Sequence, residues 1–396
     1  MRVLLTSTDN PYTAQLGGKH VHLRLLERGL KAVGIDVITL YYSRKNLKEF
    51  AKRSALILFS EKLRFKRKVE LMMDYLRKHI PREKIDLIHA HDVLSILALN
   101  SMPQKKVLTL HGYFSRENIE FLKNPKNTES IRTSLFQLER DAMKHADYVI
   151  TVDQRLKEYV LSEFNYPQNK ITVMHNAVDT DCFSPIPEHE QRKLKNSLKL
   201  DAQTFIVLVP RRLVEKNGVM YAVDAMANLK NENVKMIIAG EGPERNEIAK
   251  KAQSDNRIQL IGAIPHNRID VYFKMADIIL IPSVTSHGIQ EATSLSMLEG
   301  MACGKVVVCS DIGGMHEVIQ NMKTGIVVPE RQTKEIAVTI ERVYRSPSLR
   351  ACIGREARQY VLENHSFLAH AKRVADIYAE VMTEGNTGKI QSQTRC

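Results

Sequence analysis

Residues 276–311 read ADIILIPSVTSHGIQEATSLSMLEGMACGKVVVCSD and contain a strand–loop–helix–strand unit. Their two apolar ends, 276–283 and 305–311, have the near-continuous hydrophobicity of strands that are buried on both faces of a parallel sheet. Between them, Thr293 and Ser294 are typical of a helix start, and Gly304 is typical of a helix end. The stretch therefore predicts a strand, a short helix and a second, parallel strand.

The same alternation of short apolar runs and helical periodicity extends over most of the 396 residues. Six of these runs lie in the first half, at 2–8, 35–42, 85–91, 106–112, 146–153 and 171–177. Six lie in the second half, at 204–210, 234–242, 258–264, 276–283, 305–311 and 325–329. Strands that alternate with helices form parallel sheets, so the pattern predicts an α/β protein with two doubly wound, Rossmann-like domains.

The prolines and charged residues of 181–193 make this stretch the best candidate for a linker between the domains. We expect an N-terminal domain over 1–185, a second domain over 186–365, a C-terminal helix over 366–385 and a disordered tail over 386–396. Ligands of such domains bind beyond the carboxyl ends of the strands. The site should therefore lie in a cleft where the two sheets face each other, on residues that directly follow strands.

Composition narrows the class of protein. Apolar residues make up 43% and charged residues 26%, which is typical of a globular chain and excludes a disordered or collagen-like one. No apolar run approaches the ~20 residues that span a bilayer. The N-terminus shows no signal peptide, and the five cysteines form no C-x-x-C pair. These features favour a cytoplasmic protein.

The basic charge is concentrated in one segment. The formal net charge is +13, and residues 44–84 hold fourteen Lys or Arg against five Asp or Glu, a local net charge of +9. Apolar residues from Phe65 to Ile80 recur at helical spacing, which predicts an amphipathic helix. Its basic face is either an ordinary solvated surface or one that contacts anionic lipid or a polyanionic acceptor. No nucleic-acid motif or interleaved aromatic residue accompanies the charge, so nucleic acid is not an expected partner.

Two carboxylates flank the start of the helix predicted near 294. Glu291 precedes it and Glu299 lies inside it. The free N–H groups at 293–295 and the helix dipole form an anion site that suits a phosphate. A carboxylate accepts hydrogen bonds from hydroxyl groups, so each glutamate could hold a sugar hydroxyl on one side of a diphosphate.

These motifs resemble one family. The block PS…GIQEATSLSMLEGMACGKVVVCSDIGGMHEVI at 282–319 resembles the retaining glycosyltransferases of family 4, which have two Rossmann-like domains in the GT-B arrangement. Further matching segments follow in the expected order, at 16–37, 89–92, 108–114, 146–153, 175–185, 209–219 and 237–245. The resemblance implies a metal-independent, cofactor-free hexosyltransferase that moves sugar from a nucleotide diphosphate sugar to an acceptor hydroxyl with retention of configuration.

The resemblance also implies roles for individual residues. His111 would lie over the transferred sugar, and Arg212 and Lys216 would clamp the leaving diphosphate. Glu291 would hold hydroxyls of the donor sugar, and Glu299 would hold the ribose. The remaining expected binding residues are Gly17, Gly18, Arg211, Thr293, Ser294 and Leu295.

The basic motif of the second half departs from the family pattern, which has Gly-Arg and later Lys-Gly. Here the residues are Pro210-Arg211-Arg212 and Lys216-Asn217-Gly218. Either arginine could be the clamp. Two further motifs resemble functional ones but are interpreted as structural. The D-x-D of Asp179 and Asp181 resembles a metal-binding motif, and Gly240-Glu-Gly242 resembles a fragment of a dinucleotide-binding fingerprint.

The partners expected from the resemblance are a UDP- or GDP-sugar donor and an acceptor that is an alcohol, a glycan or a lipid-linked sugar. The expected location is the cytoplasm, and the second expected location is the surface of an anionic membrane, in peripheral contact with it. Two other functions stay open at this point. One is a nucleotide-sugar epimerase of the same fold, and the other is a non-catalytic nucleotide-sugar-binding protein.

Overall fold

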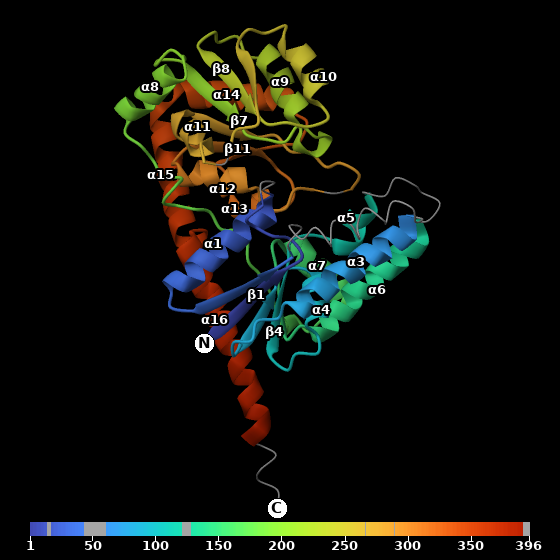
Figure 1. Cartoon of the computed structure of the whole chain (residues 1–396). Helices are drawn as coiled ribbons and strands as arrows, with labels where there is room; N and C mark the ends of the chain where they lie inside the picture. Colours follow the sequence, from blue (N-terminus) through green and yellow to red (C-terminus); the bar gives the residue numbers. More distant parts are fainter. Residues whose placement is uncertain (14–16, 43–60, 121–127, 266, 289, 391–396) are drawn as a thin grey trace, which may run out of the picture. The chain divides into compact units, whose positions relative to one another are not determined.

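The computed structural model describes residues 1–13, 17–42, 61–120, 128–265, 267–288 and 290–390 (Figure 1). The chain forms two compact units. The first combines Met1–His175 with His370–Cys396, and the second is Asn176–Ala369. The end of the chain therefore returns to the first unit, and the boundary expected at 185 lies inside the second unit.

The first unit is built on a six-stranded parallel sheet with the strand order β2-β1-β3-β4-β5-β6. Its strands are β1 (Arg2–Ser7), β2 (Asp36–Tyr41), β3 (Leu87–Ala90), β4 (Lys105–Leu110), β5 (Tyr148–Thr151) and β6 (Ile171–Val173).

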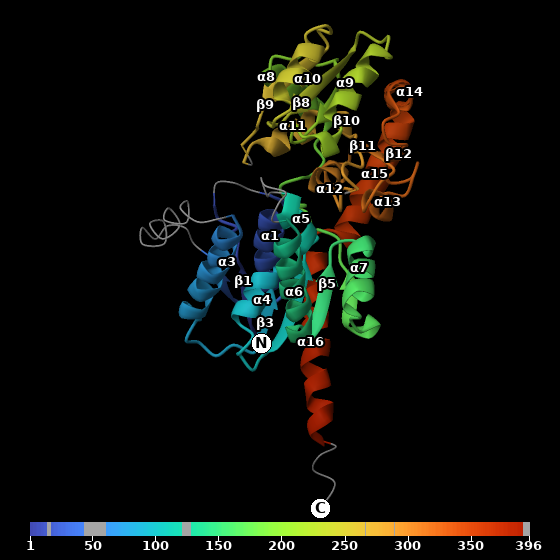
Figure 2. The ribbon, with the colours of Figure 1, turned by 90° about the vertical axis from the view of Figure 1, so that its right-hand side faces the viewer.

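Helices cover both faces of this sheet (Figure 2). Alternate residues of a strand point to opposite faces. Val3 and Leu5 of β1 pack in the cluster formed with α1 (Gly18–Ala32) and α16 (Phe367–Ile390), whereas Leu4 packs with α3 (Glu61–Lys78) and α4 (Val93–Ala98). This is why the strand is apolar throughout. The other helices of the unit are α5 (Phe114–Glu120), α6 (Thr128–His145) and α7 (Gln154–Phe164).

The second unit has its own six-stranded parallel sheet, with the order β12-β11-β10-β7-β8-β9. Its strands are β7 (Phe205–Val209), β8 (Val234–Ala239), β9 (Ile258–Gly262), β10 (Ile278–Ile281), β11 (Val306–Ser310) and β12 (Ile326–Val328).

The faces of the second sheet are covered in the same way. Val207 belongs to the core cluster with α9 (Val219–Ala227), α10 (Arg245–Ala252) and α14 (Thr333–Arg345). Ile206 and Leu208 belong to the cluster on the opposite face. The helices of that face are α8 (Glu188–Ser197), α11 (Ile269–Met275), α12 (Leu295–Ala302), α13 (Met315–Val318) and α15 (Pro347–Asn364).

The predicted fold class is confirmed. Each of the twelve strands overlaps one of the twelve predicted runs, and all pairings within the two sheets are parallel. The amphipathic helix expected around Phe65–Ile80 is α3, while part of the basic segment, 43–60, lies outside the described residues. Helix α16 continues to Ile390, beyond its expected end at 385, and 391–396 are outside the described residues. No described helix combines the length and the hydrophobicity needed to cross a bilayer.

Each strand order contains a point where the chain reverses its direction of travel across the sheet. In the first unit this point lies between β1 and β3, and in the second it lies between β7 and β10. The loops that leave two such strands diverge and open a crevice at their carboxyl ends, where open α/β sheets bind ligands. The fold therefore directs attention to the residues after these four strands.

Gly218 holds two of these loops together. It follows the 3₁₀ turn η4 (Glu215–Asn217) with a φ of +61°, in the left-handed region. A Cβ atom at this position would overlap the carbonyl group of Pro282, which directly follows β10. Only glycine allows the loop after β7 to lie this close to the loop after β10.

We predict that Gly218→Ala lowers the free energy of unfolding by roughly 3 kcal/mol or more, because backbone strain and overlap with Pro282 act together. Gly288→Ala is the matched control: its φ is +74°, but no heavy atom of the described residues, its chain neighbours aside, lies within 4 Å of an added Cβ. The free energy of unfolding of this control should fall by only roughly 1–2 kcal/mol, which is the cost of placing alanine in the left-handed region. Equal losses in chemical denaturation of the two variants would contradict the packing argument.

Candidate functional site

The centre of the site in the second unit is the buried guanidinium of Arg211, just after β7. Its Nη2 donates hydrogen bonds to Glu291 Oε2 at 2.8 Å, Asn217 Oδ1 at 2.5 Å and Ser283 Oγ at 2.9 Å. Its Nη1 donates to Ser294 Oγ at 3.0 Å. One side chain thereby joins the loop after β7, the end of β10 and the start of α12, all at the reversal point of the sheet.

Glu291 is ionised by this arrangement. Burial opposes its charge, but the neighbouring charge and hydrogen bonds of Arg211, with a smaller effect of Lys216, hold the pKa of its carboxyl below the usual value. At neutral pH the site therefore contains a fixed carboxylate whose position is set by a bidentate contact with Arg211.

The start of α12 is arranged for an anion. Ser294 is the N-cap residue, but its side chain makes no capping hydrogen bond; its hydroxyl accepts a hydrogen bond from Arg211. The N–H groups of the first turn, which begins at Leu295, are thus left without a side-chain cap, and Thr293 is buried beside them. This end of a helix carries the positive end of the dipole and favours a phosphate group.

Glu299 lies one turn inside α12 and differs sharply from Glu291. It is 8% exposed, and no described residue donates a hydrogen bond to its carboxylate. Burial raises the pKa of Glu299 to about 8. At pH 7 this carboxyl is mostly protonated, so the two glutamates of the motif occupy opposite protonation states.

The two other cations of the motif point into solvent. Arg212 and Lys216 are exposed, and neither forms an ion pair with any described residue. Their backbone carbonyls accept hydrogen bonds from Asn217 Nδ2 at 2.8 Å and from the Val284 N–H at 2.9 Å. The sequence left open which arginine is the clamp. In the structure Arg211 pairs with Glu291, whereas Arg212 and Lys216 are exposed.

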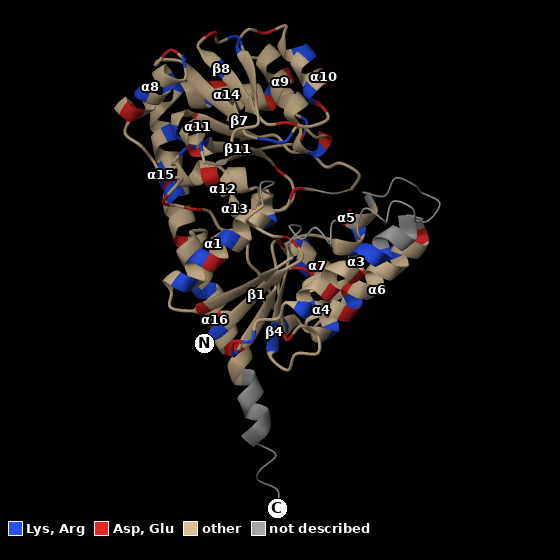
Figure 3. Cartoon of the chain, in the orientation of Figure 1, with Lys and Arg blue, Asp and Glu red and all other residues tan. Residues whose placement is uncertain are grey.

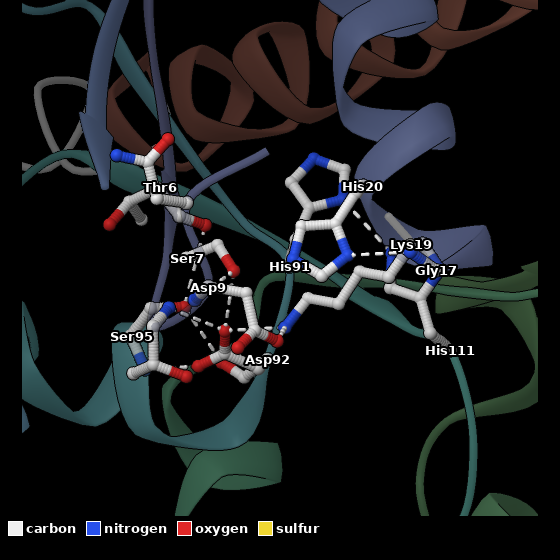
Figure 4. A network of polar contacts seen from close by, with 12 residues as sticks. Thr6, Ser7, Asp9, Gly17, Lys19, His20, His91, Asp92, Ser95 and His111 are labelled. Carbon is white, nitrogen blue, oxygen red and sulfur yellow. Dashed lines mark hydrogen bonds and ion pairs between the residues drawn. The ribbon is translucent and has the colours of Figure 1, made fainter. Parts of the chain in front are cut away.

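A second set of expected residues lies in the first unit. His111 follows β4 and His91 follows β3, and Nε2 of His111 lies 3.2 Å from Nδ1 of His91 (Figure 4). The ring of His22, from α1, meets the His111 ring edge-on with centroids 4.7 Å apart. Burial, reinforced by neighbouring cationic groups, lowers the pKa of His91 and His111 well below the usual value. Both rings are therefore neutral at pH 7.

The start of α1 is tied to the end of β3. Gly17 is the N-cap of the helix, which begins at Gly18, and the Gly17 N–H donates to His20 Nδ1 at 3.1 Å. The ammonium of Lys19 reaches Asp92 Oδ2 at 2.9 Å and Asp9 Oδ2 at 3.0 Å, as Figure 4 shows. Burial opposes its charge, yet Lys19 and backbone N–H donors hold the pKa of Asp92 below its usual value.

Sequence reasoning assigned no role to His22, His91, Lys19 or Asp92. A usable signal existed for Asp92, because an Asp directly after a buried strand is a typical helix cap, and it accepts from the Ser95 N–H at 2.8 Å. The others depend on how α1 lies against the sheet, which no local pattern encodes.

The two lookalike motifs have structural roles. Asp179 Oδ1 accepts from the N–H groups of Asp181 and Cys182, each at 3.1 Å, and so closes a turn. A Cβ atom on Gly240 or Gly242 would overlap the backbone carbonyl of Arg211 or Leu213 respectively. These glycines let the loop after β8 lie against the arginine loop.

Two family models match the chain, and together they cover most of it. The model described as Glycosyltransferase Family 4 matches residues 16–182, and the model described as Glycosyl transferases group 1 matches residues 190–360. The chain is a family 4, group 1 glycosyltransferase. The predicted family is therefore confirmed.

Curated relatives of this glycosyltransferase carry related names. An uncharacterized glycosyltransferase of Methanocaldococcus jannaschii is 26% identical over 96% of this chain and 99% of its own length. The α-D-kanosaminyltransferase of Streptomyces kanamyceticus is 25% identical over 77% of this chain and 80% of its own. The GPI3 subunit of phosphatidylinositol N-acetylglucosaminyltransferase from Saccharomyces cerevisiae is 24% identical over 77% of this chain and 66% of its own length.

Solved structures with the same fold are glycosyltransferases of the GT-B type. A sucrose-phosphate synthase from Thermosynechococcus elongatus matches with a TM-score of 0.75 and 19% identity, over 97% of this chain and 100% of that one. HepE of Anabaena, solved with UDP and glucose, matches with a TM-score of 0.72 and 18% identity, over 96% of this chain and 100% of that one. The GT-B fold of this glycosyltransferase is thereby established.

We predict that Arg211→Met lowers the free energy of unfolding by about 3–5 kcal/mol, because Glu291 is left buried without its cation. Arg212→Met, one residue along and exposed, should stay within about 0.5 kcal/mol of the wild type. Urea denaturation measures both. Adding Glu291→Gln to Arg211→Met should recover part of the loss, and no recovery would contradict the pairing.

We predict that Glu299→Gln gains stability over the wild type as the pH rises. The folded carboxyl has a pKa of about 8, above its ordinary value of 4.5. Between these values the folded state holds a proton that the unfolded state has lost, so the wild-type free energy of unfolding falls with rising pH. The amide does not titrate. The melting-temperature difference should therefore grow in favour of Glu299→Gln between about pH 5 and pH 9.

Glu335→Gln is the control for this comparison, because Glu335 is an exposed glutamate on α14 of the same unit. A Glu299→Gln difference that does not vary with pH, or that varies as the Glu335→Gln difference does, would show that the carboxyl is not held protonated by burial.

Proposed function

We propose that this glycosyltransferase moves a hexose-type sugar from a nucleotide diphosphate sugar, with UDP or GDP as carrier, to an acceptor hydroxyl. Transfer retains the anomeric configuration and needs no metal ion or cofactor. The observation that carries the proposal is the Arg211–Glu291 pair, fixed beside the uncapped start of α12 at the reversal point of the second sheet. HepE, a structural neighbour, was solved with UDP-glucose, which supports a donor of this kind.

The diphosphate is assigned to the start of α12 and to Arg212 and Lys216. Breaking the sugar–phosphate bond leaves additional negative charge on the departing phosphate. Preorganised donors and cations stabilise that charge where no metal ion does so. Arg211 already donates to four side chains, so it serves to position Glu291, while the exposed Arg212 and Lys216 have charges to offer.

The two glutamates are assigned to the two sugars of the donor. Glu291 is a carboxylate held at fixed orientation and accepts hydrogen bonds from hydroxyls of the transferred hexose. Glu299 has no protein partner among the described residues and is placed deeper in α12, where the hydroxyls of the ribose would satisfy its buried oxygens. The charged Glu291 suits a contact that is in place before the donor binds, and the protonated Glu299 suits a contact that forms only with the donor.

His111 is assigned to the face of the sugar near the reacting carbon, as the family resemblance implies. Its neutral imidazole offers a hydrogen bond without an extra charge. In the transfer, the bond from the anomeric carbon to the phosphate oxygen breaks and the bond to the acceptor oxygen forms on the same face. The proton of the acceptor hydroxyl passes to the leaving phosphate oxygen, so no protein base is required.

The acceptor is an alcohol, a glycan or a lipid-linked sugar, and we place the enzyme in the cytoplasm with peripheral contact to anionic membrane. Lys66, Arg67 and Lys68 are consecutive exposed cations of α3, and Figure 3 shows the basic residues along this helix. Basic helices of this kind are attracted to anionic lipid surfaces. Among the relatives, the GPI3 subunit is named for a phosphatidylinositol acceptor.

We predict that a UDP- or GDP-hexose raises the melting temperature of the wild-type protein, and that an ADP-sugar does so less. A ligand at about 100 times its dissociation constant adds about 2.7 kcal/mol to the free energy of unfolding. The combined variant Arg212→Gln/Lys216→Gln should lose most of this shift, since the diphosphate loses its free cations. Lys193→Gln, an exposed cation of α8 in the same unit, should keep it.

A transfer assay with the stabilising donor separates the alternatives. A glycosyltransferase releases nucleoside diphosphate in step with acceptor glycosylation, whereas an epimerase converts the donor without releasing the nucleotide and a binding protein does neither. If no nucleotide sugar shifts the melting temperature, or if the double variant responds as the wild type does, the assignment of the donor site is wrong.

A further inference from the structure

Three histidine rings from three different elements meet beyond the ends of β3 and β4, and the proposed transfer uses only one of them. They are His22 of α1, His91 after β3 and His111 after β4. One ring nitrogen from each can be chosen so that all three lie within 4.8 Å of one another. We call these residues the histidine triad.

The spacing within the triad is that of metal ligands. Nδ1 of His91 and Nε2 of His111 are 3.2 Å apart. Two imidazole nitrogens that bind one tetrahedral Zn²⁺ at about 2.0–2.1 Å are separated by about 3.4 Å. The His22 ring lies against both of the others, with centroid distances of 5.5 Å to His91 and 4.7 Å to His111. A small change in side-chain angles would bring the third nitrogen to the same ion.

The rings of the triad are largely enclosed. His22 and His91 are 2% and 1% exposed, and His111 is partly buried. Nε2 of His91 is buried and has no hydrogen-bond partner among the described residues. Nε2 points away from the Nδ1 side of the ring, so an ion bound by Nδ1 leaves Nε2 to carry the ring proton.

We propose that His22, His91 and His111 bind one divalent transition-metal ion with three imidazole nitrogens and a fourth position open to water. Imidazole ligands favour Zn²⁺, Co²⁺, Ni²⁺ or Cu²⁺ over the oxygen-preferring Mg²⁺ and Ca²⁺. Because the ion would occupy the lone pair of His111, it withholds this ring from the sugar and inhibits transfer. Only this second part rests on the proposed function; the metal site itself does not.

The binding test uses the full-length protein freed of metal with a chelator and titrated with Co²⁺, whose tetrahedral complexes absorb strongly in the visible range. The wild type should bind one Co²⁺ per chain, with Zn²⁺ displacing it and Mg²⁺ in excess failing to do so. His22→Phe keeps a ring of similar size but removes the ligand nitrogen. Loss of a ligand should weaken binding by about 100-fold or more, since even loss of an outer partner costs about 10–100-fold.

His145→Phe is the matched control, because His145 is an exposed histidine at the end of α6 in the same unit. It should bind Co²⁺ as the wild type does. Melting temperatures check that each variant folds, and His22→Gln serves if the Phe variant does not. The proposal is overturned if the wild type shows no tetrahedral Co²⁺ spectrum, or if the His22 variant binds as tightly as the wild type.

The inhibition test compares each protein with its own metal-free rate. Zn²⁺ should suppress sugar transfer by the wild type and by His145→Phe, and should suppress it far less in His22→Phe. If the protein binds Co²⁺ but turns over no donor when it is metal-free, the proposed function is refuted and the metal site stands. If the metal-free protein transfers sugar but binds no Co²⁺, the metal site is refuted and the proposed function stands.

Discussion

The buried ion pair between Arg211 and Glu291 is the constraint on which the second unit's site depends. Two charges removed from water destabilise the fold unless their geometry is good and their remaining hydrogen bonds are made. Here Asn217, Ser283 and Ser294 accept further hydrogen bonds from the two Nη atoms of the guanidinium. The loops after β7 and β10 must therefore keep one relative position, and it is this position that brings a carboxylate and an uncapped helix start together.

The two glutamates of the motif differ in their pKa values because their surroundings differ. Glu299 is buried within this short helix and Glu291 is partly buried just before it, but among the described residues only Glu291 has a guanidinium within hydrogen-bond distance. Its pKa is lowered, while that of Glu299 is raised to about 8. Under the proposed function, a donor that satisfies Glu299 with hydroxyl groups would stabilise its charged form, so donor binding would be coupled to the release of a proton.

The sequence predicted the fold well because parallel strands covered on both faces are apolar at every position, and β1 and β7 show this directly. It also placed helix α12, since helix-start residues and a terminating Gly304 act locally. It could not choose between Arg211 and Arg212, because the backbone turn after β7 decides which side chain turns inward. Nor could it find the triad, since His22 meets His91 only after α1 has packed on the sheet.

The two units have a similar cation–carboxylate pair at the reversal point of the sheet, but different residues lie around it. In each, a cation that follows the first strand of the sheet, Lys19 or Arg211, pairs with a carboxylate, Asp92 or Glu291, that follows the neighbouring strand. Such pairing fixes the crevice before any ligand arrives, which lowers the cost of ordering it on binding. Beyond the pair, the second unit has the exposed Arg212 and Lys216, whereas the first has the neutral rings of His91 and His111. One topology thereby presents cations in one unit and neutral imidazoles in the other, which is the difference on which the two proposed sites rest.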